Sequence, residues 1–299
     1  MLFFLQAGLS RLLRFPTSTA ILSLSWTVRT RGGLELRTLR WAADGDSRAH
    51  LLLIHGIAEH AGRHAHVATR FAQAGIETHA FDLRGFGASS GLRAYLDRWS
   101  QYHDDVEDQL AAIRAVSGRL PVVLYGHSMG GLIALGYVLA DAPRPQPDLL
   151  VLSAPAIGAN VALWKRSLAD VLGRIAPRME IANDLPPGGL SHDPQVELAY
   201  RSDPLNYHST TARLGMELFH EQARVASRLS QIPALSLPTY VLHGADDEVV
   251  PVSSSAPLEH PENVTRRVYP GLRHEMHNEP EAVAVIGDTT RWISAQISM

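Results

Sequence analysis

The 299-residue chain contains no cysteine. Disulfide bridges, thiolate metal sites and a cysteine nucleophile are therefore excluded together. An excess of charge of one sign is also missing, because 27 Lys and Arg residues balance 30 Asp and Glu residues, which leaves a formal net charge of −3. Since no basic surface is indicated, we expect no nucleic-acid partner. The lack of cysteine is compatible with a cytoplasmic location, which we expect.

Long hydrophobic runs are absent as well. Residues 1–5 are apolar, but the first basic residue, Arg11, follows them, whereas a secretory signal carries its positive charge before the apolar core. The longest uncharged N-terminal run, residues 15–28, is shorter than the roughly 20 apolar residues that cross a bilayer. We expect residues 1–26 to form an extension outside the fold. A degenerate targeting segment and residues upstream of the true start are the alternatives.

The chain does contain a regular alternation of strand and helix patterns. Short apolar runs, typical of buried parallel strands, alternate with longer stretches that favour helices. This rhythm predicts an α/β fold with a mostly parallel central sheet flanked by helices, preceded by an edge hairpin at 27–31 and 34–41. The expected later strands are 50–55, 77–81, 121–125, 149–153, 238–243 and 265–269, and the expected helices are 63–74, 102–116, 131–140 and 279–297.

The rhythm changes between about residues 155 and 236, where prolines interrupt the chain and no strong parallel strand is visible. We expect one catalytic domain over residues 27–299 with a helical cap inserted at about 155–236. An insertion that follows a strand's carboxyl end must lie over the edge of the sheet where such folds bind ligands. An apolar helical stripe begins at Trp164 and ends at Ile175. Packing is the usual role of such a stripe; an apolar tunnel wall and contact with a lipid interface are the alternatives.

The most informative stretch is Gly126-His127-Ser128-Met129-Gly130. It follows an expected strand and precedes an expected helix, so it lies at a strand-to-helix turn. The strained turn requires residues without bulky side chains at 126 and 130 and exposes Ser128 at the carboxyl edge of the sheet. A glycine-rich turn whose serine only caps the helix is the alternative.

A serine hydroxyl becomes a good nucleophile when an imidazole takes its proton and a carboxylate orients that imidazole. Asp247 and His274 follow the last two expected strands, in the order Ser, Asp, His of the α/β-hydrolase arrangement. From the residues alone, Asp246 remains an alternative acid and His277 an alternative base. His55 ends an earlier strand, where we expect it to shape a loop by hydrogen bonding.

The tetrahedral oxyanion that forms during ester cleavage needs two hydrogen-bond donors. The backbone N–H of Met129, directly after the serine, is one expected donor. The loop that follows His55 predicts the backbone N–H of Ile57 as the second.

The chain resembles the monoacylglycerol lipase and lysophospholipase branch of the α/β-hydrolases. The similarity extends from about Val28 to the C-terminus. Within Gly244–Pro251 it implies that Asp247 rather than Asp246 is the acid, and within Tyr269–His274 it implies that His274 rather than His277 is the base. His192 stands where relatives usually carry arginine. The motifs that carry the resemblance are His55–Arg63, Asp82–Ser89, Gly126–Gly131, Gly244–Pro251 and Tyr269–His274.

The resemblance implies a serine carboxylic-ester hydrolase that cleaves monoacylglycerols, or similar lipid monoesters, to fatty acid and glycerol through an acyl-enzyme. It implies no cofactor and no metal. Lysophospholipase, short-chain carboxylesterase and acyl transfer to another acceptor are the alternatives within the same chemistry. A non-catalytic binding protein of the same fold is the alternative from another class. The apolar cap suggests transient peripheral contact with a membrane or micelle.

Overall fold

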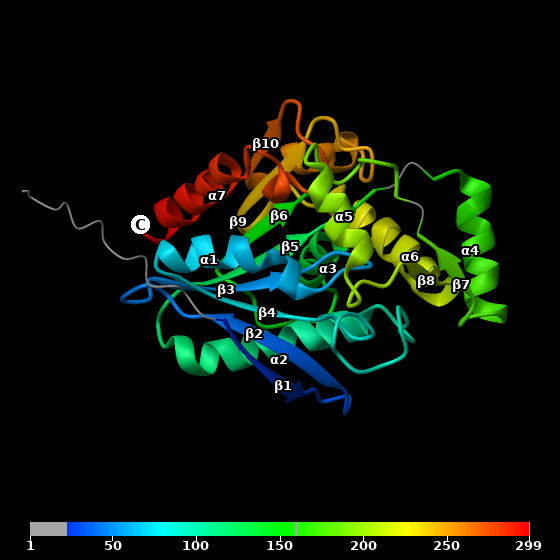
Figure 1. The fold of residues 1–299 in the computed structure, drawn as a ribbon, viewed down its shortest axis with the longest axis horizontal. Coiled ribbons are helices and arrows are strands. Elements are labelled where there is room, and N and C mark those ends of the chain that lie inside the picture. Colours follow the sequence, from blue (N-terminus) through cyan, green and yellow to red (C-terminus); the bar gives the residue numbers. More distant parts are fainter. Residues whose placement is uncertain (1–22, 159–160, 184, 299) are drawn as a thin grey trace, which may run out of the picture.

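The computed structural model describes residues 23–158, 161–183 and 185–298. In these ranges, eight strands form a central sheet in the order β1-β2-β4-β3-β5-β6-β9-β10 (Figure 1). The strands are β1 (Ser23–Arg29), β2 (Glu35–Trp41), β3 (Ala49–Ile54), β4 (Ile76–Phe81), β5 (Val122–His127), β6 (Leu149–Ser153), β9 (Ala234–Gly244) and β10 (Glu262–Tyr269).

The sheet is mostly parallel. Strand β2 pairs antiparallel with β1 and β4, and the other neighbouring strands pair in parallel. Strands β3, β4, β5 and β6 are buried along their whole length. Burial explains the largely apolar runs of β3, β5 and β6, whereas β4 buries Glu77, Thr78 and His79. The predicted α/β class with flanking helices is confirmed.

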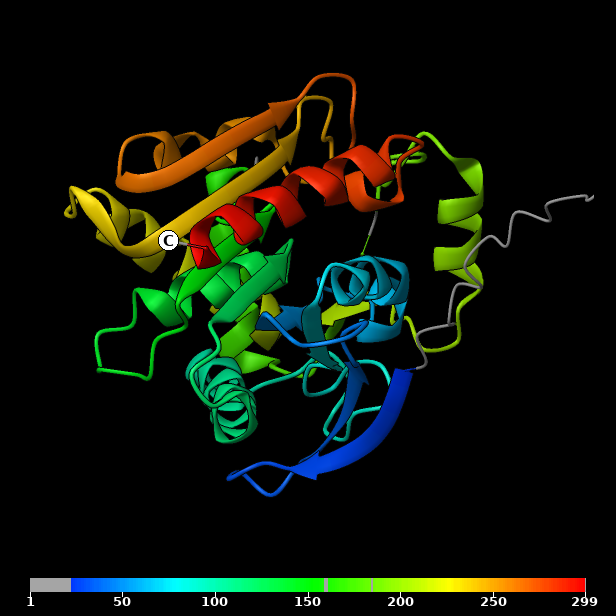
Figure 2. The same ribbon diagram turned by 90° about the vertical axis from the view of Figure 1, so that its left-hand side faces the viewer.

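Helices cover both faces of the sheet, and each face has its own hydrophobic core. Helices α1 and α7 contact one another and pack on one face, and α2 and α3 pack on the other (Figures 1 and 2). The bounds are α1 (Ala65–Gln73), α2 (Ser100–Ser117), α3 (Met129–Val138) and α7 (Ala282–Ile297), with short 3-10 turns η1 (Ala61–His64), η2 (Val252–Glu259) and η3 (Met276–Asn278).

Strand β1 begins earlier than the expected start of the fold at residue 27. Ser23 pairs with Trp41 and Trp26 pairs with Thr38, so residues 23–26 extend the edge hairpin. The boundary at residue 26 is therefore wrong by four residues, because residues 23–26 continue the polar–apolar alternation of this strand and pair with β2. The rest of the predicted extension, residues 1–22, lies outside the described residues.

Between β6 and β9 the chain leaves the sheet and forms a separate group of elements at one end of the molecule (Figure 1). Helix α4 packs on α6, where Gly173 allows close approach because a Cβ there would lie 2.6 Å from the Cβ of Met216. No helix in the described ranges is long and apolar enough to cross a membrane. The elements are α4 (Leu163–Ile175), β7 (Glu180–Ala182), α5 (Pro194–Ser202), β8 (Ser209–Thr211) and α6 (Ala212–Leu229).

The apolar stripe of α4 points largely outward. Trp164 is 64% exposed and Ile175 is 74% exposed, with Leu168 and Val171 about half exposed. Packing, the usual role of such a stripe, therefore does not apply to these four side chains. Sequence periodicity identifies an apolar face of a helix but does not show which partner covers it.

Candidate active site

Ser128 lies in a sharp turn between β5 and α3. Its backbone adopts φ 54° and ψ −119°, a strained conformation for a residue with a side chain. A Cβ at Gly126 would lie 2.3 Å from the Gly130 carbonyl oxygen, and a Cβ at Gly130 would lie 2.3 Å from that of Ile54. The predicted need for small residues at both positions is therefore confirmed.

The Ser128 side chain makes no capping hydrogen bond to helix α3, so the alternative in which this serine merely caps a helix is not supported. The turn is instead held by its own backbone. The Ser128 N–H donates to the Ser153 carbonyl at 2.9 Å, and the Ala156 N–H donates to the Ser128 carbonyl at 3.0 Å. Ser128 is consequently fixed above the carboxyl ends of β5 and β6.

Asp247 and His274, which come from the loops after β9 and β10, meet in a buried pair. His274 Nδ1 lies 2.7 Å from Asp247 Oδ2. The alternatives lie elsewhere: Asp246 is exposed, and His277 is buried with neither ring nitrogen bonded to a described residue. The structure thus brings Asp247 and His274 together and leaves Asp246 and His277 apart from this pair.

Hydrogen bonds keep the Asp247 carboxylate ionised. Burial alone would raise its pKa, but the charge of His274 and hydrogen bonds from His243, His274 and the Val250 N–H hold the pKa well below its usual range. The Val249 and Val250 N–H groups both donate to Oδ1, at 2.9 and 2.8 Å. Asp247 therefore presents a fixed negative charge to His274.

The pKa of His274 responds in the opposite direction. Burial would lower it, but the charge and hydrogen bond of Asp247 raise the pKa of His274 above its ordinary value. Because Nδ1 is engaged by Asp247, Nε2 is the ring nitrogen that is left to exchange a proton.

His243, at the end of β9, is a part of this cluster that the sequence analysis missed. Its Nε2 lies 3.2 Å from Asp247 Oδ2 and 2.8 Å from the Val250 carbonyl, and its Nδ1 lies 2.9 Å from Ser255 Oγ. It thereby fixes the rotamer of the carboxylate. Its place at a strand end, four residues before Asp247, could have indicated that it contacts this aspartate.

Ser128 and His274 line a small pocket, to which the segment between β6 and β9 also contributes. One part of the lining is apolar and comprises Ile57, Leu185, Leu190 and Val249. The other part is polar and comprises Glu59, Arg63, Tyr200 and Glu275. A ligand bound at Ser128 therefore meets apolar and hydrogen-bonding surfaces together.

The polar part of the pocket is built around Arg63, which joins two segments far apart in the chain. Its guanidinium donates to Glu59 Oε2 at 2.7 Å and to both Glu275 oxygens at 2.7 and 2.9 Å. Burial would raise the pKa of Glu59 and Glu275, but positive charge lowers both values, chiefly from His64 and Arg63 at Glu59 and from Arg63 at Glu275. Glu59 and Arg63 lie in the motif His55–Arg63, but the motif alone predicted no role for them.

Two backbone donors near Ser128 are unengaged. The N–H groups of Ile57 and Met129 donate no hydrogen bond to another described residue. Ile57 lines the pocket, and Met129 is the first residue of α3, where N–H groups have no partner within the helix. The preceding residue, Gly56, is held by Glu59, whose Oε1 accepts its N–H at 2.6 Å.

His55 shapes this loop, as expected from its place at a strand end. Its Nδ1 lies 2.7 Å from the Gly56 carbonyl, and its Nε2 accepts the Leu83 N–H at 2.9 Å. It thereby ties the loop after β3 to the loop after β4.

Comparisons with known proteins find relatives over most of the chain. Residues 45–281 match the model of a family described as serine aminopeptidase S33 (Hydrolase_4). A monoacylglycerol lipase from Mycolicibacterium smegmatis is 37% identical over 89% of this chain and 95% of its own length. The phospholipase YtpA of Bacillus subtilis is 29% identical over 81% of this chain and 93% of its own. The crystal structure of Paleococcus ferrophilus monoacylglycerol lipase superposes with a TM-score of 0.76 at 26% identity, covering 87% and 99% of the two chains.

Proposed function

The chain belongs to the serine aminopeptidase S33 family and to the monoacylglycerol lipase branch of the α/β-hydrolases, and we propose a function from this membership. The proposed reaction is hydrolysis of monoacylglycerols to fatty acid and glycerol. The observation that carries the proposal is the pocket at Ser128, which combines an apolar wall with a hydrogen-bonding wall. A monoacylglycerol has the same two parts, an acyl chain and a small uncharged diol.

In the proposed reaction, Ser128 Oγ attacks the ester carbonyl carbon and gives its proton to His274 Nε2. The C–O bond to glycerol then breaks, and the same proton passes to the departing glycerol oxygen, which leaves an acyl group on Ser128. A water molecule attacks this acyl-enzyme with His274 again as base, and the fatty acid is released. Asp247 stabilises the imidazolium in both halves and holds its orientation.

The N–H groups of Ile57 and Met129 are the proposed oxyanion donors. Both are free of other partners among the described residues, so no hydrogen bond must be broken before they bind the developing negative charge. Preorganised donors of this kind typically contribute about 3 kcal/mol each to transition-state stabilisation.

The charges around the pocket favour a neutral head group. Arg63 is the cation of the polar wall, and its donors are shared between the two carboxylates of Glu59 and Glu275. The residues that line this wall thus include two carboxylates and one guanidinium, and the carboxylate oxygens are hydrogen-bond acceptors for hydroxyl groups. A phosphate head group would lie beside these two carboxylates, which favours a monoacylglycerol over a lysophospholipid.

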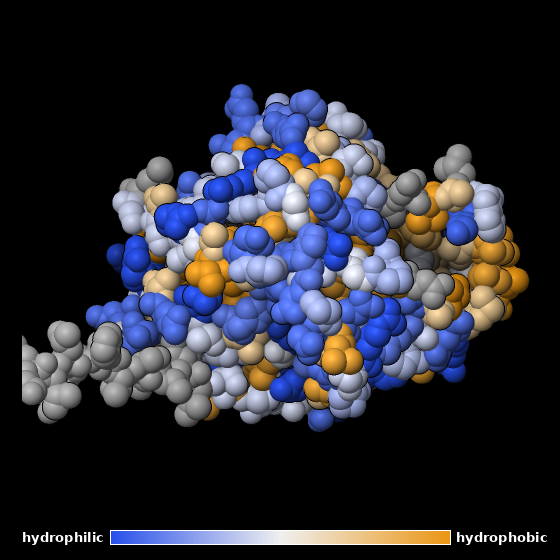
Figure 3. All heavy atoms as spheres, turned by 45° about the horizontal axis from the view of Figure 1, so that its top comes forward, coloured by the Kyte–Doolittle hydropathy of each residue, from blue (hydrophilic) through white to orange (hydrophobic). Residues whose placement is uncertain are grey.

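The cap supplies a surface for contact with lipid. Trp164, Leu168, Val171 and Ile175 of α4, with Met179 and Ile181 beside them, form an exposed apolar patch (Figure 3, right edge). Because monoacylglycerols partition into membranes and micelles, we propose that this patch inserts shallowly into the lipid interface and holds the enzyme there peripherally. A cytoplasmic enzyme with such a patch would bind membranes transiently.

The proposal is tested by comparing kcat/KM for four substrates in one detergent system. They are 1-monooleoylglycerol, oleoyl-lysophosphatidylcholine, oleoyl-lysophosphatidic acid and p-nitrophenyl butyrate. We expect the monoglyceride to be preferred and the doubly anionic lysophosphatidic acid to be the poorest lipid. A preference for either lysolipid would instead support a lysophospholipase, and cleavage of the short ester alone would support a carboxylesterase.

Acyl transfer is distinguished from hydrolysis in the same assay. With an added alcohol, a hydrolase releases mainly free oleate, whereas a transferase forms mainly the new oleoyl ester. We expect free oleate to dominate.

A further inference from the structure

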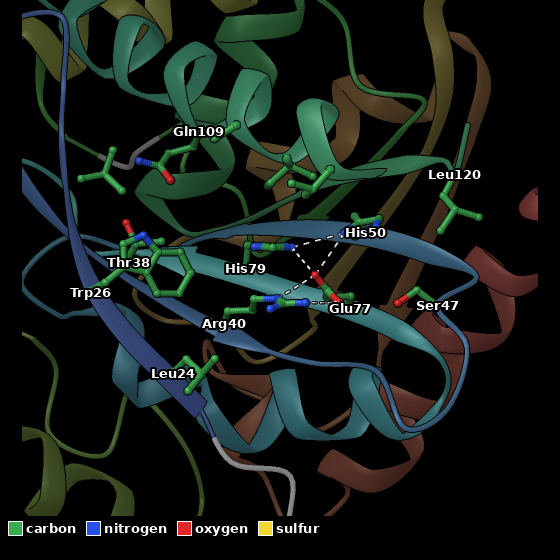
Figure 4. Close-up of a pocket in the computed structure, with 14 residues that line it drawn as sticks. Leu24, Trp26, Thr38, Arg40, Ser47, His50, Glu77, His79, Gln109 and Leu120 are labelled. Atoms are coloured by element: carbon green, nitrogen blue, oxygen red, sulfur yellow. Dashed lines mark hydrogen bonds and ion pairs between the residues drawn. The ribbon is translucent and has the colours of Figure 1, made fainter. Parts of the chain in front are cut away.

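Three potential metal ligands gather on one face of the sheet, far from Ser128. His50 lies near the start of β3, and Glu77 and His79 lie on β4 (Figure 4). The parallel register pairs His50 with Glu77, and the two-residue spacing puts Glu77 and His79 on the same face. All three side chains are more than nine-tenths buried.

The distances between the three ligand atoms suit a shared cation. His50 Nδ1 lies 3.3 Å from His79 Nε2, Glu77 Oε1 lies 3.5 Å from His50 Nδ1, and it lies 3.2 Å from His79 Nε2. Hydrogen bonds between such atoms are usually shorter, about 2.9 Å. An ion about 2.0–2.1 Å from each of three tetrahedral ligands separates those ligands by about 3.3 Å.

The geometry points to a binding site for a first-row divalent metal ion, with Zn²⁺ the best match to two imidazole nitrogens and one carboxylate oxygen, and we propose that His50 Nδ1, His79 Nε2 and Glu77 Oε1 bind it. The circle through the three atoms has a radius of about 1.9 Å, so an ion at zinc–nitrogen distance lies just outside their plane. The fourth coordination position is then open. The family resemblance implies no metal, and the site is not visible in the sequence because its ligands come from two strands that meet only in the folded sheet.

The three groups are in the protonation states that bind metal. Burial is the main influence that lowers the pKa of both His50 and His79, so each ring is neutral at pH 7 and keeps a lone pair. Burial would raise the pKa of Glu77, but the hydrogen bonds and charge of Arg40 lower it. The carboxylate is therefore ionised.

Arg40 orients the Glu77 carboxylate but also competes with the proposed ion for one of its oxygens. Its Nε donates to Glu77 Oε1 at 2.8 Å and its Nη2 donates to Oε2 at 2.9 Å. With an ion at Oε1, the contact at Oε2 orients the ligand carboxylate, whereas the contact at Oε1 opposes the ion. The Arg40 side chain is 38% exposed, so its guanidinium has room to move toward solvent.

The three ligands line a pocket of about 480 Å³ between the β1–β2 hairpin and α2 (Figure 4). Two buried polar atoms in its wall, Thr38 Oγ1 and Gln109 Nε2, have no hydrogen-bond partner among the described residues. The rest of the wall is largely apolar, with Trp26, Ile113 and Val116 among its residues. These two atoms give the pocket wall polar groups that are free to bind water.

The site is separate from the proposed catalytic centre. His50 lies near the amino end of β3, whereas Ile57 follows the carboxyl end of the same strand. Binding can therefore be measured without reference to ester hydrolysis, and a failure of one proposal leaves the other intact.

The test uses the full chain without a polyhistidine tag, titrated with Co²⁺ and Zn²⁺. Cobalt binding is followed by visible absorption, which identifies four-coordinate geometry, and zinc binding by calorimetry and metal analysis after gel filtration. The variants are His79→Ala, His50→Gln and Arg40→Gln. His260→Ala, which removes an exposed imidazole outside the cluster, is the matched control because the chain has 15 histidines.

We expect one ion per chain in the wild type and in His260→Ala, with the absorption of four-coordinate cobalt. His79→Ala and His50→Gln should weaken binding at least ~10-fold, and Arg40→Gln should strengthen it because the competing cation is gone. Circular dichroism and hydrolysis of p-nitrophenyl butyrate verify that each variant is folded. Sub-stoichiometric binding by the wild type, or equal affinity in folded His50→Gln or His79→Ala protein, would overturn the proposal.

Discussion

The carboxylate of Glu59 accepts a 2.6 Å hydrogen bond from the backbone N–H of Gly56, the residue immediately before Ile57. Arg63 and His64 donate to or contact the same carboxylate, at 2.7 and 3.1 Å. Buried charged side chains therefore hold the loop that carries Ile57, one of the two proposed oxyanion donors. Its rigidity does not depend on bound substrate.

Glu59 should consequently affect catalysis by positioning the loop. We expect Glu59→Ala to lower kcat/KM by about 100-fold, the usual effect of misplacing a catalytic donor. Glu59→Gln retains an acceptor for Gly56 and should retain more activity. Steady-state kinetics with p-nitrophenyl butyrate measure both, and Glu262→Ala, at an exposed position on β10, is the control. Wild-type kcat/KM in a folded Glu59→Ala protein would contradict this role.

Substitution of the two adjacent aspartates, Asp246 and Asp247, should have very different effects on kcat. Asp247→Asn removes the charge that stabilises the His274 cation, so we expect kcat to fall by about 10³- to 10⁴-fold. Asp246→Asn changes an exposed side chain and should leave kcat within about twofold, as is usual for surface substitutions. The pair is compared under identical conditions with a soluble ester. Equal losses in the two variants would show that Asp247 has been assigned wrongly.

The pH profile should report His274. The protonated ring cannot accept the Ser128 proton, so activity falls as pH decreases through the pKa of His274. Because Asp247 raises that pKa, the midpoint of the acid limb of kcat/KM should lie above the usual histidine value of about 6.5. In Asp247→Asn, whose residual activity is measurable with an activated ester, the midpoint should move to lower pH. An acid limb below pH 6 in the wild type would contradict the assignment.

The exposed patch of α4 should matter for lipid substrates alone. We expect the double substitution Val171→Ser and Ile175→Ser to reduce hydrolysis of 1-monooleoylglycerol in vesicles several-fold, since each buried methylene contributes about 0.8 kcal/mol to membrane binding. Hydrolysis of p-nitrophenyl butyrate should not change. Val283→Ser on α7, which is also exposed, is the matched control. Vesicle activity equal to that of the wild type would exclude this patch as the contact surface.

Structural features that depend on residues close together in the chain could be predicted from the sequence. The apolar run of β5, the two glycines of the turn and the helix after them lie within one stretch, and backbone sterics connect them directly. A topological rule predicted that an acid and a histidine after the last two strands would meet, because carboxyl ends of parallel strands share one edge of the sheet. The family resemblance then selected Asp247 over Asp246 and His274 over His277.

Features that depend on distant partners could not be predicted. Arg63 meets Glu275 across 212 positions of sequence, and no local pattern records that contact. His50 and His79 converge only because β3 and β4 are neighbours in register. The outward orientation of Trp164 depends on which side of α4 packs on α6, which periodicity leaves undetermined.

The most direct test of the central claim is the release of oleate from 1-monooleoylglycerol by the wild type and by Ser128→Ala. The substitution removes the proposed nucleophile and leaves Asp247, His274 and the oxyanion donors in place. We predict rapid release by the wild type and a loss of at least ~10³-fold in the variant. Comparable release by a folded Ser128→Ala protein would contradict the account, because no acyl-enzyme could then form at this turn.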